Sequence, residues 1–172
     1  AWLPLLKLSG ISKSGQGFPL LQDNETVGMI LEASKAEAKA IPSQMLLEFL
    51  AHAGSGFYKS LAHRGFSWLR LPQRSTADYF QIPPELPGIW INRVLPYGTG
   101  SNVLQRGDYL TKIGKWPLSH DGKIQHPEWG LSLFDLLFLD QLKVGDPLEL
   151  ELIRDGKAIV LQSRVSAYEE DG

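Results

Sequence analysis

Two neighbouring segments carry most of the structural information in this chain: GIWINRVLP at residues 88–96 and LQRGDYLTKIG at residues 104–114. In the first, an apolar run after a glycine predicts a strand that ends at Pro96. In the second, a Gly-Asp pair opens a predicted strand over residues 108–113. The glycine-rich residues 97–102 between them predict a loop.

The last third of the chain predicts one helix and one hairpin. Residues 131–142 are apolar almost throughout and predict a helix, which follows a long predicted loop over residues 116–130. The Asp-Gly pair at residues 155–156 stands between two apolar runs. It predicts a tight hairpin that joins strands over residues 148–154 and 158–165.

The first 56 residues predict short strands and one helix. Residues 18–21 and 26–31 predict a hairpin, and the small and charged residues 33–40 predict a loop or a helical turn. A helix is predicted to begin at Ser43, which is a suitable N-cap before an apolar stripe at helical spacing.

Composition excludes several classes of function. The chain has 172 residues and a formal net charge of −2, so it lacks the basic footprint of a nucleic-acid or anionic-membrane binder. It has no cysteine, and its apolar runs are too short to span a bilayer. No signal peptide is visible at residues 1–4. His120, Asp121, His126 and Glu128 match no metal-ligand spacing, so we expect neither a metal nor a cofactor.

Three segments resemble, in the right order, motifs of the PDZ domains of the HtrA/Deg proteases. Residues 88–96 resemble their G-φ-x-φ-x-x-V-x-P strand, where φ is apolar. Residues 104–114 resemble their L-x-x-G-D-x-I-x-x-I-x-G segment. Residues 144–157 resemble their closing hairpin, which carries Gly-Asp and then Arg-x-Gly. Together these segments cover about half of the chain.

This resemblance implies an α+β fold that is mostly β. Residues 57–172 are expected to form a PDZ-like, partly open barrel with two helices. Residues 1–56 are expected to be a remnant of the C-terminal trypsin-like β-barrel with its linking helix. Within them, residues 17–30 resemble the strand pair after the catalytic serine of Deg proteases, and residues 40–43 resemble their A-I-P strand end.

The chain departs from the family at the nucleophile. The family motif is G-N-S-G-G-P, whereas residues 14–19 read SGQGFP, so Gln16 stands at the serine position and Ser14 at the oxyanion-hole glycine. A glutamine amide cannot form an acyl-enzyme. Placing Ser14 and Gly15 at the nucleophile requires a two-residue insertion before Pro19. The catalytic His and Asp of the family would belong to a preceding barrel, so we expect no enzyme activity, with Gln16 as a degenerate nucleophile position.

The resemblance also implies a binding site. PDZ domains bind an extended peptide as an added strand beside a helix, and a glycine-containing loop receives its terminal carboxylate. Arg64 would add positive charge to that loop, and the strand over residues 66–71 would pair with the peptide. Alternatively, Phe66 and Trp68 are ordinary core residues and Arg64 is a solvated charge. The predicted peptide-binding residues are Arg64, Gly65, Phe66, Ser67, Trp68, Leu69, Leu133 and Leu137.

The leading functional prediction is a non-catalytic PDZ module that binds peptides or unfolded protein segments in a quality-control system. One alternative is a fragment or regulatory part of a trypsin-like serine endopeptidase. A second is an oligomerisation scaffold whose groove is filled by the chain itself or by a neighbouring subunit, and a homo-oligomer remains open. The resemblance places the protein in the cell envelope or periplasm, with no nucleic-acid partner and no direct membrane insertion.

Overall fold

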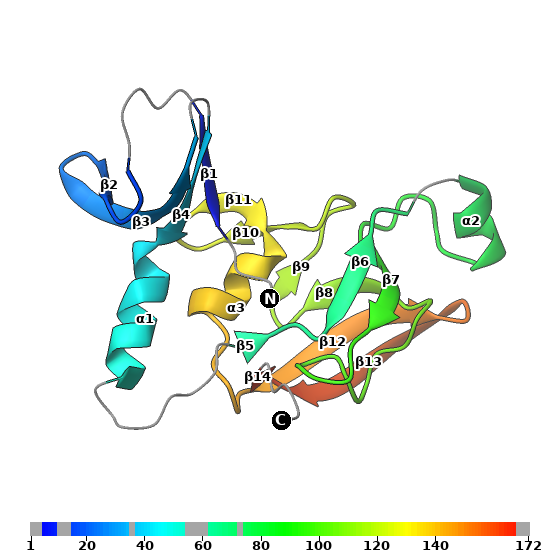
Figure 1. Ribbon diagram of the computed structural model, residues 1–172. Helices are drawn as coiled ribbons and strands as arrows, with labels where there is room; N and C mark the ends of the chain where they lie inside the picture. The colour runs from blue at the N-terminus through cyan, green and yellow to red at the C-terminus, as the bar shows by residue number, and fades with distance from the viewer. Residues whose placement is uncertain (1–4, 10–14, 35–36, 54–61, 72–73, 168–172) are drawn as a thin grey trace. The chain divides into compact units, whose positions relative to one another are not determined.

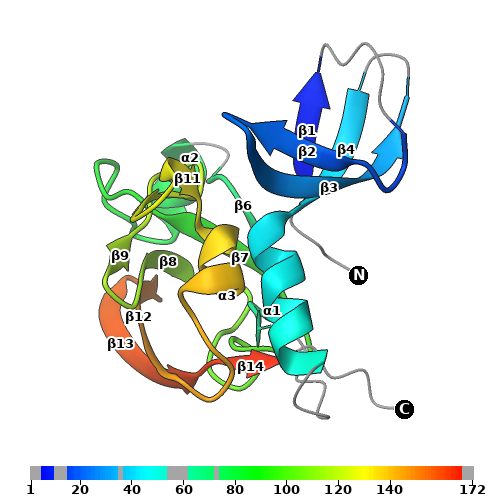
Figure 2. The same cartoon turned by 90° about the vertical axis from the view of Figure 1, so that its left-hand side faces the viewer.

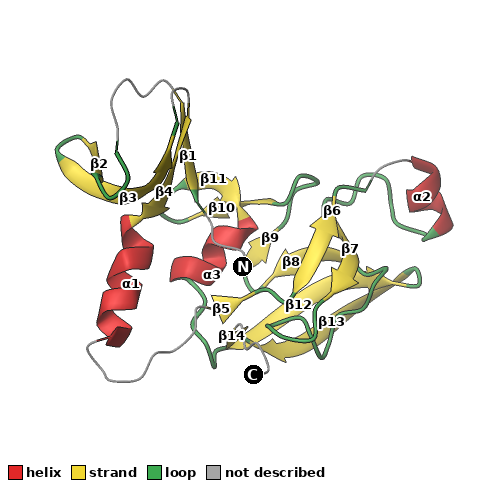
Figure 3. Cartoon of the chain, in the orientation of Figure 1, coloured by secondary structure: helices red, strands yellow, loops and turns green. Residues whose placement is uncertain are grey.

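The computed structural model is mostly β, with a few short helices, as expected for the predicted α+β class (Figure 3). The chain divides into two compact units, Ala1–Lys59 and Ser60–Gly172. We describe each unit by itself. The structure describes residues 5–9, 15–34, 37–53, 62–71 and 74–167.

The first unit is built on a four-stranded antiparallel sheet with the order β1-β4-β3-β2 (Figure 1). The predicted hairpin is present as β2 and β3. Its turn residues Asp23 and Asn24 both have positive φ, as the turn of a tight hairpin requires. A small apolar cluster centred on Ile30 lies on one face of the sheet. The strands are β1 (Leu6–Ser9), β2 (Pro19–Gln22), β3 (Glu25–Ala33) and β4 (Glu37–Pro42).

The prediction of a loop or helical turn over residues 33–40 is wrong for its second half, which belongs to β4. In this strand Ala38 and Ala40 are buried, while Glu37 is exposed and Lys39 is partly exposed. Side chains on a strand alternate between the two faces of the sheet. Small alanines between charged residues therefore fit a strand, paired on both sides by β1 and β3, that packs one face on a thin core. Propensity alone does not reveal this pattern.

The predicted first helix is present as α1 (Ser43–Ala53) and begins directly after β4. In the described part of the chain, no helix is both long and apolar enough to cross a membrane.

The second unit is built on an antiparallel sheet with the order β13-β12-β8-β7-β6, and β9 pairs with β8 (Figure 1). The predicted strands and the closing hairpin are confirmed, with Asp155 and Gly156 both at positive φ in its turn. The sheet strands are β6 (Phe66–Leu69), β7 (Ile89–Val94), β8 (Tyr109–Ile113), β9 (Trp116–Pro117), β12 (Pro147–Arg154) and β13 (Lys157–Arg164).

Shorter elements complete this unit. β5 (Ala62–His63) pairs with β14 (Ser166–Ala167), and β10 (Lys123–His126) pairs with β11 (Gly130–Leu133). A short helix, α2 (Arg74–Tyr79), lies between β6 and β7 along the chain.

The predicted loop over residues 116–130 and the predicted helix over residues 131–142 are both wrong in their extent. The loop contains β9 and β10, and the start of the helix is the strand β11, which leads into the 3-10 turn η1 (Phe134–Leu136) and the helix α3 (Leu137–Asp140) (Figure 2). The first leucines of this segment follow the two-residue period of a strand rather than the period of a helix. Leu131 and Leu133 are both exposed on one face of β11. Antiparallel pairing with β10 overrides the local helical preference.

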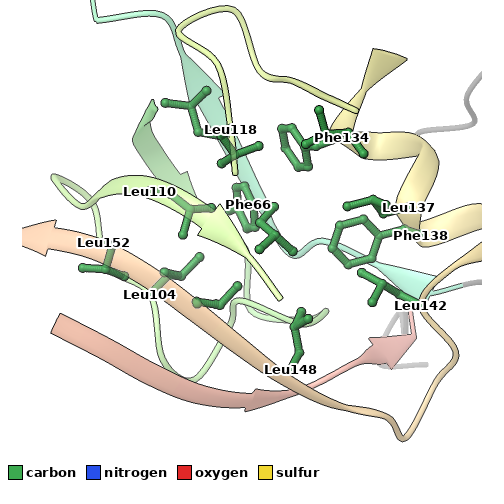
Figure 4. Packing of buried hydrophobic residues seen from close by; sticks show 14 of the residues in the cluster. Phe66, Leu104, Leu110, Leu118, Phe134, Leu137, Phe138, Leu142, Leu148 and Leu152 are labelled. Atoms are coloured by element: carbon green, nitrogen blue, oxygen red, sulfur yellow. The ribbon is translucent and has the colours of Figure 1, made fainter. Parts of the chain in front are cut away.

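The main core lies between this sheet and the segment formed by η1 and α3. Figure 4 shows Phe134, Leu137 and Phe138 pointing from that segment toward Phe66 of β6. Phe66 and Phe134 stack with their ring centroids 6.0 Å apart. Strand β6 is therefore held against α3 by buried aromatic and leucine side chains.

A buried histidine fixes the β10–β11 hairpin to α3. His126 Nε2 lies 3.1 Å from Asp140 Oδ1, and its Nδ1 accepts hydrogen bonds from the amides of Glu128 and Trp129. Glutamine in place of His126 offers a donor for Asp140, but its acceptor Oε1 is not fixed by a ring at the position of Nδ1, which the two amides contact. We expect a loss of about 1–2 kcal/mol in the free energy of unfolding. The exposed His120, changed to glutamine, should lose less than about 0.5 kcal/mol in the same urea titration. Equal losses would contradict this role of His126.

Candidate functional site

Strand β6 is the last strand in its sheet order, so its ladder has one neighbour, β7, among the described residues of the unit. Leu95 donates its amide hydrogen to Gly65 O, which therefore faces β7. Carbonyl groups alternate in direction along a strand, so Phe66 O faces the opposite edge. That carbonyl accepts a hydrogen bond of 2.7 Å from Arg64 Nε. The edge is thus capped at its first acceptor by a side chain rather than by another strand.

The loop before β6 is held in one conformation by the segment after β7. His63 O accepts hydrogen bonds from the amide and the hydroxyl of Thr99, and Arg64 O accepts one from the amide of Gly100. Gly65 has φ +77°, and a Cβ there would lie 2.6 Å from the carbonyl oxygen of Tyr97. Only glycine fits this combination of positive φ and close backbone approach. A tight turn is thus present at Gly65, in the predicted glycine-containing loop.

Histidine 63 in this loop acts as an acceptor. The amide of Gly65 donates to His63 Nδ1 over 3.1 Å. Burial, and then the nearby positive charge of Arg64, lowers the pKa of His63. The ring is therefore neutral at pH 7, with its proton on Nε2, and supplies no charge to the loop.

Arg64 is not a solvated charge. Its Nη1 forms a short ion pair with Asp135 Oδ1 of η1, and the two side chains are only 14% and 8% exposed. Burial raises the pKa of Asp135, and the contact with Arg64 opposes that shift. The pair joins the loop before β6 to the turn η1 that leads into α3.

The other predicted residues take several positions. Phe66 is buried in the core, and Trp68 is partly buried with its ring 5.8 Å from that of Phe134. Ser67 donates a hydrogen bond to Asn92 Oδ1, and Leu69 is half exposed. Phe66 thus matches the alternative of an ordinary core residue.

Leu133 and Leu137 do not form the expected pair on one helix. Leu133 lies on β11 and is 46% exposed, whereas Leu137 begins α3 and is fully buried. The wall that faces β6 consists instead of Phe134 and Asp135 in η1, with Leu137 behind them. The sequence does carry a signal for this: Asp135 is the only charged residue between Leu131 and Leu139. A lone charge in an apolar run calls for a buried partner.

An open cleft continues beyond the end of β6. It has a volume of about 420 Å³ and is lined by Arg70 and Leu71 on the chain that leaves β6, and by Leu86, Tyr109 and His120 among others. The Tyr109 hydroxyl donates to Leu86 O over 2.9 Å.

Gln16, which the resemblance predicts at the nucleophile position, lies in the first unit. Gln16 is exposed in a tight turn, next to Gly17, whose amide donates to Ile30 O over 2.7 Å. Ser14 lies outside the described residues. Among the described residues, no group of three or more His, Cys, Asp or Glu side chains could hold a metal ion.

Comparisons with known proteins identify homologues at low identity. No family model matches the chain. The putative mitochondrial protease Do-like 11 of Arabidopsis thaliana is 23% identical over 149 residues, which are 86% of this chain and 26% of that protein. The mitochondrial protease Do-like 4 of the same plant is 22% identical over 87% of this chain and 29% of that protein. The chain thus spans little more than a quarter of these relatives.

Solved structures with the same fold are HtrA-type proteases. The protease AlgW with a decapeptide superposes with a TM-score of 0.59 at 16% identity, over 86% of this chain and 43% of that one. The same protease with a tripeptide gives a TM-score of 0.53 at 18% identity, over 87% of this chain and 48% of that one. The predicted relationship to HtrA/Deg proteases is confirmed.

Proposed function

We propose that this homologue of the HtrA-type proteases is a non-catalytic module that binds extended peptides along β6. The proposal assigns residues 57–172 to a PDZ-like domain and residues 1–56 to a remnant of a trypsin-like barrel. The observation that carries it is the position of β6 at the end of its sheet, beside a glycine loop and the wall formed by η1 and α3.

Physical chemistry favours β-augmentation at this edge. A terminal strand offers backbone donors and acceptors to a guest chain, and alternate side chains of the guest enter neighbouring pockets. The capped acceptor Phe66 O does not block this, because a carbonyl oxygen can accept two hydrogen bonds. The structural relatives were solved with a decapeptide and a tripeptide, which supports a peptide as the ligand class.

The absence of catalysis belongs to the same proposal. Gln16 at the serine position supports it, since an amide is no nucleophile. The alternative, a fragment of a serine endopeptidase, is favoured by the short share of the protease relatives that the chain spans. A cleavage assay with casein or a fluorogenic peptide distinguishes the non-catalytic module from the endopeptidase fragment. We expect no turnover by this polypeptide, and measurable cleavage that survives repurification would favour the endopeptidase.

We further propose that the protein acts in protein quality control. The resemblance to the HtrA/Deg proteases favours the cell envelope as its location. The names of the two plant relatives place those proteins in mitochondria. Because the two locations differ, we propose for this chain only a compartment that contains unfolded protein segments.

A peptide titration followed by amide chemical shifts tests the binding site. We expect decapeptides, pooled with random residues at their last four positions, to shift the amides of Gly65–Leu69 and Phe134–Leu137. The opposite edge of the sheet, β13, is an internal control and should not shift. Shifts that cluster on β13, or no shifts at any peptide concentration up to about 1 mM, would reject the site. Light scattering in the same samples separates a binder from a scaffold, because a scaffold is already assembled without peptide.

A further inference from the structure

We infer that the ion pair between Arg64 and Asp135 selects ligands that do not place a free terminal carboxylate at the loop before β6, so that internal extended segments bind there. This inference rests on the proposed peptide-binding function and names the ligand class of the same groove.

The cation at this end of the groove is already neutralised. Arg64 Nη1 is bound to Asp135 Oδ1, and Arg64 Nε is bound to Phe66 O. With side chains 14% and 8% exposed, the pair is largely removed from water. The guanidinium is therefore fixed across the start of the β6 edge, with an acidic group of the chain as its counter-ion.

One backbone donor at the same place, the amide of Gly65, is also occupied. The amide of Gly65, in the loop that would receive a carboxylate, donates to His63 Nδ1 inside the protein. The carbonyls of residues 63–65 are bound to the segment after β7, so the loop cannot rotate its amides without losing these bonds. A ligand carboxylate would have to compete with Asp135 for Arg64 and with His63 for the amide of Gly65.

The energetics disfavour a carboxylate. A second carboxylate beside Arg64 is repelled by Asp135, and the two charges share one cation. Displacing Asp135 instead leaves a carboxylate that is 8% exposed without its partner, which is strongly unfavourable. Burial already raises the pKa of Asp135, which means that it disfavours the ionised carboxylate. Without the contact to Arg64, that carboxylate would lose its main stabilising partner. A chain that continues past the loop brings only neutral amides and meets neither penalty.

Two matched peptide pools test the inference. Both contain the decapeptides described above, one with free C-terminal acids and one with C-terminal amides. For the unchanged protein we expect dissociation constants within about twofold between acid and amide forms. In Asp135→Asn the side chain still accepts a bond from Arg64 but the negative charge is gone. The acid forms should then bind about tenfold more tightly than the amides, equivalent to about 1.4 kcal/mol.

Asp155→Asn is the control, since it makes the same charge change in the distant turn between β12 and β13, where asparagine also accepts positive φ. It should leave the acid-to-amide ratio near one. A second variant, Arg64→Gln, should show no preference for acids over amides, because the cation that a carboxylate would seek is absent while Asp135 remains. A preference for acids in this variant would overturn the inference.

The outcomes distinguish the inference from the proposed function. An unchanged protein that binds acids at least tenfold more tightly than amides keeps the peptide-binding function and overturns the inference. So does an Asp135→Asn protein with no gain for acids. If neither pool binds, the inference and the proposed function fall together.

Discussion

Replacing Arg154 by methionine is expected to lower the free energy of unfolding by about 3–5 kcal/mol. Its Nε lies 2.7 Å from Asp108 Oδ1 and its Nη2 lies 2.8 Å from Oδ2, while Asp108 is completely buried. The hydrogen bond to Asp108 also raises the pKa of Arg154. Methionine fills much of the same space but leaves a buried carboxylate without a cation.

The measurement is urea unfolding followed through the amides of β7, β8 and β12. Lys112→Met is the matched control, because Lys112 pairs with Glu151 over 2.6 Å on the same sheet with side chains 34% and 38% exposed. An exposed pair contributes about 0–1 kcal/mol. Similar losses in the two variants would show that burial does not set the strength of the Arg154 pair.

The Arg154–Asp108 contact also joins two of the sequence motifs, the Gly-Asp pair at residues 107–108 and the Arg-x-Gly segment at residues 154–156. Asp108 follows Gly107 in the strand-opening Gly-Asp pair, and its Oδ2 accepts the amide of Gln105. Arg154 Nη2 in addition donates to Val103 O. Arg154 therefore binds both the buried Asp108 and the backbone of the loop that precedes it.

Changing Gly65 to alanine is expected to destabilise the second unit by about 2–4 kcal/mol. The residue has φ +77°, and an added Cβ would lie 2.6 Å from Tyr97 O and 2.8 Å from the carbonyl carbon of Gly98. Both contacts are with backbone, which cannot move aside as a side chain would. Because Gly65 also opens β6, we expect peptide affinity to fall at least tenfold in the variant that remains folded.

Gly145→Ala is the control for backbone strain alone. Gly145 has φ +100°, and no heavy atom lies within 4 Å of an added Cβ. Its loss should be about 1–2 kcal/mol, with peptide affinity unchanged. Unfolding curves and peptide titrations for both variants check this expectation, and equal behaviour of the two would reject the close approach at Gly65 as the cause.

Much of the fold could be predicted because its signals are local. The turn pairs at residues 23–24 and 155–156 specify positive φ, and hairpins form at both. The strands over residues 89–94 and 109–113 combine apolar runs with a glycine or proline at an end. The helix predicted over residues 131–142 failed at its first half, because a leucine at every second position fits a paired strand as well as a helical stripe.

Within the candidate site, the local backbone was predicted but the contacts between distant residues were not. The glycine turn at Gly65 and the strand after it were found from sequence, since a backbone requirement leaves its mark on the residue itself. The ion pair was not, because Arg64 and Asp135 are 71 residues apart and neither spacing nor composition relates them.

The amino-acid sequence alone thus determined the turns and the strands between them, all of which depend on neighbouring residues. Only the tertiary structure decided that Leu137 is core, that His63 is a neutral acceptor and that Arg64 is neutralised. Burial and charge pairing are set by groups brought together from distant parts of the chain, and these contacts exist only once the chain has folded.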